Sequence, residues 1–182
     1  MMHQKYILLD VAETLLHKPL LWERYGEVLA EYGYEVADLE LKKKHRLLSE
    51  AIQFPDVTTR AFYEHFNRKL LESLDIVSTP ELLNRIYEAC KGLPWEPFDD
   101  TSVLQALPNK MGILSNFHSG LRRLLNEKLP ELVFNDIFIS EELAVAKPDV
   151  RFFEHALSVL GLEANQVIYV GDSMKLDIVP AL

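Results

Sequence analysis

Four short, largely apolar runs divide the chain. They cover Tyr6–Leu9, Met111–Ser115, Phe134–Ile139 and Val167–Val170. Continuous apolar runs of this length are typical of strands that are buried on both faces of a parallel sheet. Apolar residues at helical spacing lie between the runs, at Ser119–Leu129 and Val150–Leu160. The alternation of strand and helix predicts right-handed crossovers and a doubly wound α/β fold with a parallel sheet.

Residues 18–95 follow a different pattern, because they contain four helical patterns and no strand pattern. The expected helices are Leu20–Glu31, Asp38–Ile52, a third that places Phe62, Phe66, Leu70 and Leu74 on one apolar stripe, and a fourth that starts at Ser78 and ends near Gly92. Ser78 and Glu81 can form a capping box at the start of the fourth helix. We therefore predict a core of residues 1–17 and 96–182 and an inserted all-α part of residues 18–95, with Pro94 and Pro97 at the boundary.

Polar side chains follow three of the predicted strands directly. These residues are Asp10, Ser115, Asn116, Asp172 and Ser173. Ligands bind beyond the carboxyl ends of the strands in open parallel sheets, so we expect these residues to line one crevice. Lys147 stands before Pro148, at the predicted start of the last core helix, and adds a positive charge to the same end of the sheet.

This set of residues favours phosphoryl transfer. Asp10 can attack phosphorus and form an aspartyl-phosphate. Asp10 and Asp172 can hold a hard dication, for which Mg²⁺ is the natural choice. Ser115, Lys147 and the main chain at Asn116 can hold the phosphate oxygens of a small-molecule substrate.

Asp177 completes the predicted set, five residues beyond Asp172. Its carboxylate can contact the metal through water or orient Lys147. The residues alone leave these two roles open.

The four motifs resemble those of the haloacid-dehalogenase-like superfamily, in the same order. They are Asp10–Leu15, Ile113–Asn116, Lys147–Pro148 and Gly171–Ser173 with Asp177. The resemblance covers nearly the whole chain and implies a Rossmann-like core, a four-helix cap that closes over the site, and a Mg²⁺-dependent phosphatase of small phosphorylated metabolites. It also implies that the backbone carbonyl of Ala12 is a metal ligand. The first two motifs are similar to those of the haloacid-dehalogenase-like domain-containing protein 3 branch.

Ala12 departs from the family pattern, because the family's phosphatases carry a second Asp two residues after the nucleophile. A methyl group cannot donate or accept the proton that this Asp transfers, a function worth roughly 10²–10⁴-fold in rate. Four explanations remain open. They are a slow or specialised hydrolase that uses good leaving groups or a nearby acid such as His17, a phosphonate-cleaving enzyme that needs a cap lysine, a regulatory protein that binds metal and phosphate without turnover, and a substitution introduced to trap a complex.

Composition narrows the partners of the protein. The chain carries 19 Lys and Arg against 28 Asp and Glu, for a net charge of −9. This acidic balance argues against a nucleic acid as a partner, because phosphate backbones are bound by basic surfaces. Cys90 is the single cysteine, and no export signal or membrane-spanning run is present, so we expect a cytoplasmic protein without membrane partners. The sequence leaves the oligomeric state open.

The resemblance also bears on the number of strands in the sheet. The family's core continues with a further strand and helix beyond the position that corresponds to Leu182, which is the last residue here. We therefore expect the sheet to lack its C-terminal strand.

Overall fold

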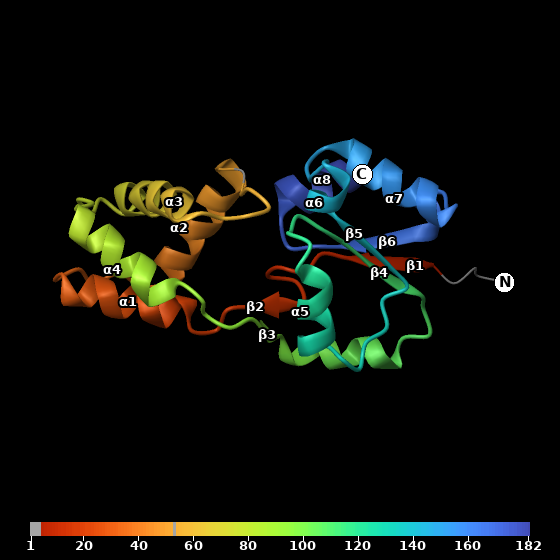
Figure 1. Ribbon diagram of the computed structural model, residues 1–182, viewed down its shortest axis with the longest axis horizontal. Helices are drawn as coiled ribbons and strands as arrows, with labels where there is room; N and C mark the ends of the chain where they lie inside the picture. Colours follow the sequence, from red (N-terminus) through yellow and green to blue (C-terminus); the bar gives the residue numbers. More distant parts are fainter. Residues whose placement is uncertain (1–4, 53) are drawn as a thin grey trace. The chain divides into compact units, whose positions relative to one another are not determined.

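Two compact units make up the chain (Figure 1). The core unit consists of residues 1–17 and 95–182, and the helical unit consists of residues 18–94. The computed structural model describes residues 5–52 and 54–182. None of the helices in these described ranges is both long enough and apolar enough to span a membrane.

A four-stranded parallel sheet in the order β5-β4-β1-β6 forms the centre of the core unit. The strands are β1 (Tyr6–Leu9), β4 (Met111–Ser115), β5 (Asp136–Ile139) and β6 (Val167–Val170). Leu9 pairs with Ile113 of β4 and with Val170 of β6, so these three strands end at the same edge of the sheet. The predicted α/β fold with a parallel sheet is confirmed.

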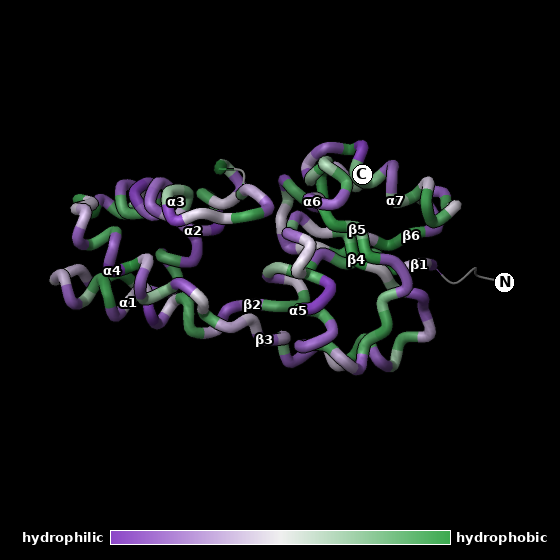
Figure 2. Tube along the Cα trace, viewed as in Figure 1, coloured by the Kyte–Doolittle hydropathy of each residue, from purple (hydrophilic) through white to green (hydrophobic). Residues whose placement is uncertain are grey.

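Alternating residues of β1 pack against helices on opposite faces of the sheet, which is the reason that this strand is a continuous apolar run. Ile7 and Leu9 of β1 belong to the apolar cluster that includes Leu121 and Leu125 of α5 (Leu121–Lys128). Tyr6 and Leu8 belong to the cluster beneath α7 (Val150–Leu160). Both clusters are fully buried at their centres. Figure 2 shows the hydrophobic colouring concentrated along the central strands.

Several short elements complete the core unit. They are β2 (Leu16–His17), β3 (Glu96–Pro97), η1 (Asp99–Ala106), α6 (Ser140–Leu143), η2 (Ala164–Gln166), η3 (Met174–Ile178) and α8 (Val179–Ala181). The antiparallel pair of β2 and β3 was not expected, because two residues are too few to show an alternating pattern. β5 begins at Asp136, two residues later than predicted, and Phe134 packs against the apolar cluster of α5 instead of joining the strand.

The helical unit contains four helices around one apolar core. They are α1 (Leu21–Glu31), α2 (Asp38–Ala51), α3 (Arg60–Ser73) and α4 (Pro80–Cys90). Phe66 and Leu70 of the predicted stripe are buried in this core. The prediction of Ser78 as the cap of α4 was wrong. Thr79 caps the helix, because Pro80 occupies the first helical position and the Thr79 side chain accepts a hydrogen bond from the Leu82 N–H at 3.2 Å.

Candidate functional site

Asp10 and Ser115 meet where β1 and β4 end. Asp10 is 6% exposed and Ser115 is 1% exposed. The Ser115 hydroxyl donates a hydrogen bond of 2.8 Å to Oδ1 of Asp10. The main-chain N–H of Asp10 is itself bound to the carbonyl of Val170 at the end of β6, at 2.9 Å. The strand ends therefore place a buried carboxylate and a hydroxyl in direct contact, as their positions in the sequence predicted.

Lys147 reaches the same carboxylate from the loop before α7. Its ammonium lies 2.8 Å from Oδ1 of Asp10 and 2.6 Å from Oδ1 of Asp177, and the side chain is only 2% exposed. Burial on its own would lower the pKa of Lys147, but the negative charges of Asp10 and Asp177 together outweigh it and the pKa is raised. The lysine is therefore a buried cation held between two carboxylates.

Asp177 is held by three hydrogen bonds. Its Oδ1 accepts from Lys147, and its Oδ2 accepts from the main-chain N–H of Ser173 at 2.9 Å. Tyr169 supplies the third bond, to Oδ1 at 2.7 Å. Gly171 makes this approach possible, because a Cβ at that position would stand 2.6 Å from Oδ2 of Asp177.

Asn116 contacts the main chain of Lys147 through its side-chain amide. Its Nδ2 donates to the carbonyl of Lys147 at 2.9 Å, and its Oδ1 accepts from the N–H of the same residue at 2.8 Å. This two-point contact fixes the loop that carries the buried lysine. The side chain of Asn116 is thus directed at the protein, and the main chain of Asn116 is the part of the residue that was expected to meet a phosphate oxygen.

Tyr169 of β6 also contacts these residues, although the sequence pattern predicts it only as part of an apolar strand. Its hydroxyl accepts a hydrogen bond of 3.0 Å from the Lys147 ammonium and donates to Asp177. Burial, followed by the charges of Asp10 and Asp177, raises the pKa of Tyr169 far above its ordinary value. The phenol therefore keeps its proton. Tyr169 lies two residues before Gly171, and its side chain is on the opposite face of β6 from Ile168. This position in the sequence is the signal that could have identified it.

Three carboxylates form a cluster that could bind a metal ion. Asp10, Asp172 and Asp177 each offer an oxygen, and these oxygens lie within 4.8 Å of one another. Carboxylate oxygens in this number and spacing suit Mg²⁺, which prefers hard oxygen ligands. Asp10 and Asp172 fit this role better than Asp177, whose oxygens already accept three hydrogen bonds.

Ala12 lies in a tight turn directly after β1. The carbonyl of Val11 accepts hydrogen bonds from the N–H groups of Leu15 and Leu16, both at 2.9 Å, and Ala12 forms an isolated bridge with Leu16. The turn therefore fixes the backbone at position 12, directly after the strand that carries Asp10, but the alanine side chain has no proton to donate. His17, the alternative acid, stacks on the ring of Phe98 at 4.1 Å between centroids.

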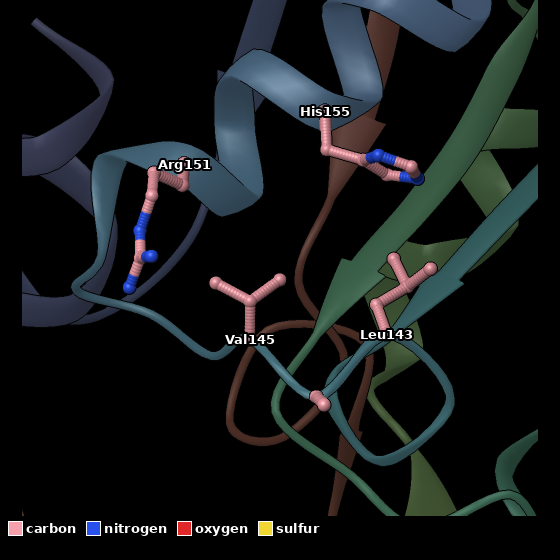
Figure 3. Close-up of a pocket in the computed structure, with 5 residues that line it drawn as sticks. Leu143, Val145, Arg151 and His155 are labelled. Carbon is pink, nitrogen blue, oxygen red and sulfur yellow. The ribbon is translucent and has the colours of Figure 1, made fainter.

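A separate pocket of about 290 Å³ lies between α6 and α7 (Figure 3). It is lined by Leu143, Ala144, Val145, Arg151 and His155. Figure 3 shows Arg151 and His155 projecting from α7 beside the loop that carries Val145. The Arg151 guanidinium is paired with Asp149, and Asp10, Ser115 and Lys147 are absent from the lining. The pocket is therefore distinct from the cluster of carboxylates.

Comparison with known proteins identifies the family of the chain. A family model described as haloacid dehalogenase-like hydrolase matches residues 4–181. The chain is 28% identical over 186 residues to haloacid dehalogenase-like hydrolase domain-containing protein 3 of Danio rerio, which covers 92% of this chain and 76% of the relative. This match confirms the resemblance to that branch. The chain is also 29% identical over 187 residues to a glyceraldehyde 3-phosphate phosphatase of Methanopyrus kandleri, covering 96% of this chain and 78% of the relative.

A solved structure agrees with this assignment at the level of the fold. The HAD-hydrolase YfnB from Bacillus subtilis, described as bound to magnesium, superposes with a TM-score of 0.62 at 19% identity. The alignment covers 98% of this chain and 82% of that protein. The family model matches nearly the full sequence, and the solved structure has the same fold. The chain belongs to the haloacid dehalogenase-like hydrolases, a family in which its similar relatives include named phosphatases.

Proposed function

We propose that this protein hydrolyses small phosphate esters through an aspartyl-phosphate formed on Asp10, with Mg²⁺ as its cofactor. The observation that carries this proposal is the arrangement of donors around Asp10. Ser115 and Lys147 both contact Oδ1, at 2.8 Å each. These contacts orient the carboxylate and leave Oδ2 as the oxygen that attacks phosphorus.

The reaction proceeds in two displacements. In the first, Oδ2 of Asp10 forms a bond to phosphorus while the bond from phosphorus to the ester oxygen breaks, and that oxygen leaves with the electron pair and takes any proton it needs from solvent. In the second, a water oxygen attacks the same phosphorus and gives up a proton to solvent while the bond to Asp10 breaks, which releases inorganic phosphate and restores the carboxylate. Ser115 and Lys147 exchange their contact with Asp10 for phosphoryl oxygens and stabilise the charge on them.

Asp10 and Asp172, with the carbonyl of Ala12, are the residues that we propose for the metal. Hydrolases of this family generally use Mg²⁺, and the spacing of the carboxylates supports such a site. Bound Mg²⁺ would neutralise part of the charge of the carboxylates and of the phosphoryl group. We assign Asp177 mainly to the orientation of Lys147, because its 2.6 Å contact with the ammonium is the shortest in the network.

Ala12 limits the reaction to substrates that need little help with proton transfer. The ester oxygen must leave without a proton from position 12, and water must attack without a base there. We therefore propose a slow or specialised hydrolase whose substrates have good leaving groups, such as acyl phosphates. Asn116 acts through the loop of Lys147, and its main chain can still meet a phosphoryl oxygen.

We further propose that the helical unit serves as the cap that selects the substrate. The support is its position in the sequence between the first and second motifs and the family to which the chain belongs. Caps of this kind exclude water and complete the site when substrate binds.

The test is a turnover assay with para-nitrophenyl phosphate and with an acyl phosphate, in the presence of Mg²⁺. Asp10→Asn should abolish hydrolysis, and equal activity in this variant would refute the nucleophile. Ala12→Asp should raise activity at least about tenfold, because it restores a proton donor. An unchanged rate in a folded, metal-binding Ala12→Asp protein would favour a regulatory protein that does not turn over phosphate esters.

Cleavage of a phosphonate is a second candidate, supported by one observation. Burial lowers the pKa of Lys18 in the helical unit, and a lysine of lowered pKa is suited to form an imine with a carbonyl substrate. Borohydride should then trap a carbonyl phosphonate on wild-type protein and not on Lys18→Met. Absence of an adduct on the wild type would remove this candidate.

A further inference from the structure

Tyr169 occupies a point in the site where three parts of the core unit meet. It lies on β6, opposite Leu8 of β1, and its hydroxyl contacts the loop of Lys147 and the segment of Asp177. The same hydroxyl lies 3.3 Å from the carbonyl of Leu114 on β4. The proton goes to Asp177, because the distance of 2.7 Å is much shorter and the acceptor is charged.

The ammonium of Lys147 has three N–H groups, and three acceptors surround it. These are Oδ1 of Asp10 at 2.8 Å, Oδ1 of Asp177 at 2.6 Å and the hydroxyl oxygen of Tyr169 at 3.0 Å. Because the lysine is 2% exposed, solvent has little access to replace a lost acceptor. A buried N–H without a partner costs about 1–3 kcal/mol.

Tyr169 is also held in place by the sheet and by an aromatic neighbour. Its backbone is part of the sheet, and its ring packs edge-on against Phe153 of α7 at 5.1 Å between centroids. Lys147, in contrast, sits in a loop and reaches the site through a long flexible side chain. The position of the ammonium is therefore fixed by what it contacts.

We propose that Tyr169 is a positioning residue for Lys147, and through it for the phosphoryl group. The phenol of Tyr169 accepts a hydrogen bond from the Lys147 ammonium and donates one to the Asp177 carboxylate, which also contacts that ammonium. A single side chain thereby helps to set the position of Lys147 relative to Asp177. This inference rests on the proposed function, because it assigns a residue to the reaction at the same site. Misplacement of a charged group by about 1 Å can cost up to roughly 10²-fold in rate.

The test compares two tyrosines in the same apolar cluster. Tyr169→Phe removes the hydroxyl and keeps the ring. Tyr6→Phe is the matched control, because Tyr6 is a buried tyrosine of β1 whose hydroxyl donates to a carboxylate, Oδ2 of Asp136, at 2.7 Å. Binding of tungstate, an analogue of phosphate, is measured by calorimetry with Mg²⁺ present, and kcat and KM are measured with an acyl phosphate.

We expect Tyr169→Phe to weaken tungstate binding and to lower kcat by about tenfold, with a smaller change in KM, because the ammonium acts on charge that develops during the reaction. Tyr6→Phe should change each quantity less than about twofold. Urea denaturation of both variants reports whether they lose comparable stability.

Each other outcome overturns the inference. If Tyr169→Phe matches the wild type while Asp10→Asn abolishes turnover, the positioning role is wrong and the proposed function stands. If both tyrosine variants fall equally, the effect is a general one of losing a buried phenol. If the wild type neither binds tungstate nor shows turnover that depends on Asp10, the proposed function fails and this role fails with it.

Discussion

The two units of this protein bury different kinds of side chains. The core unit buries charge, since Asp10, Lys147 and Asp177 are each no more than 6% exposed and contact one another. The helical unit buries aliphatic and aromatic residues, and Asn67 is its buried polar side chain among the described residues. The Oδ1 of Asn67 accepts a hydrogen bond from the hydroxyl of Tyr25. The core unit therefore tolerates the cost of desolvated charge at one place, the cluster that we propose as the active site.

Removal of the buried cation should have the largest effect on stability. Lys147→Met leaves two carboxylates buried without their partner, so we expect the free energy of unfolding to fall by about 3–5 kcal/mol. Lys69→Met is the control in the helical unit, because the Lys69–Glu72 pair is about half exposed and solvent screening leaves it little effect on stability. Urea denaturation measures both. Similar losses of unfolding free energy in the two variants would show that the buried charges of the core unit do not matter more for stability than an exposed ion pair of the helical unit.

Truncation inside the helical unit should have the next largest effect. Leu70 is fully buried, and Leu70→Ala should cost about 3 kcal/mol, because it removes apolar contacts and leaves a cavity. Leu39 is 79% exposed, so Leu39→Ala should stay within about 0.5 kcal/mol of the wild type. Denaturation followed by the fluorescence of Trp22, in the same unit, reports both. A small loss for Leu70→Ala would show that apolar burial is not what stabilises this unit.

His45 should make the helical unit sensitive to acid. Its ring packs edge-on against Trp22 and Phe66, and burial lowers the pKa of His45 from 6.5 to about 4. Because the folded pKa lies below the unfolded one, the unfolded chain binds the proton more readily. Stability is therefore full above about pH 6.5 and declines as the pH falls toward 4, by about 1–2 kcal/mol for a partly buried ring.

His45→Phe keeps an aromatic ring and cannot bind a proton, so it should flatten this decline. His65→Phe is the matched control, since His65 is exposed on α3 of the same unit. Urea denaturation at several pH values between 4 and 7 provides the comparison. An equal decline in wild type and in His45→Phe would assign the acid sensitivity to other groups.

The framework of the core could be predicted from the sequence because buried parallel strands leave a strong pattern. The apolar runs located β1, β4 and β6 to the residue, and the ends of parallel strands necessarily meet, which brought Asp10 and Ser115 together. β2 and β3 escaped prediction because a ladder of two residues carries no periodicity. The cap at Thr79 was missed by one residue, since Ser78 and Thr79 have equivalent side chains and only the position of Pro80 separates them.

Side-chain direction was the part that sequence could not supply. Asn116 stands beside Ser115 in the chain, yet its amide is used entirely by the main chain of Lys147. Tyr169 is an aromatic residue in an apolar strand, and only the folded arrangement shows that its hydroxyl meets Lys147 and Asp177. The residues that perform chemistry are read from motifs, whereas those that position them depend on contacts between distant segments.

In the mechanism that we propose, Asp10 becomes phosphorylated and Ala12 leaves the second displacement unassisted. The most direct measurement is mass spectrometry of the protein after incubation with Mg²⁺ and an acyl phosphate, followed by an acid quench and peptide mapping. We expect a phosphoryl group on Asp10 that accumulates in the wild type, disappears faster in Ala12→Asp and never forms in Asp10→Asn. Turnover of the acyl phosphate by Asp10→Asn, or a phosphoryl group on another residue, would contradict it.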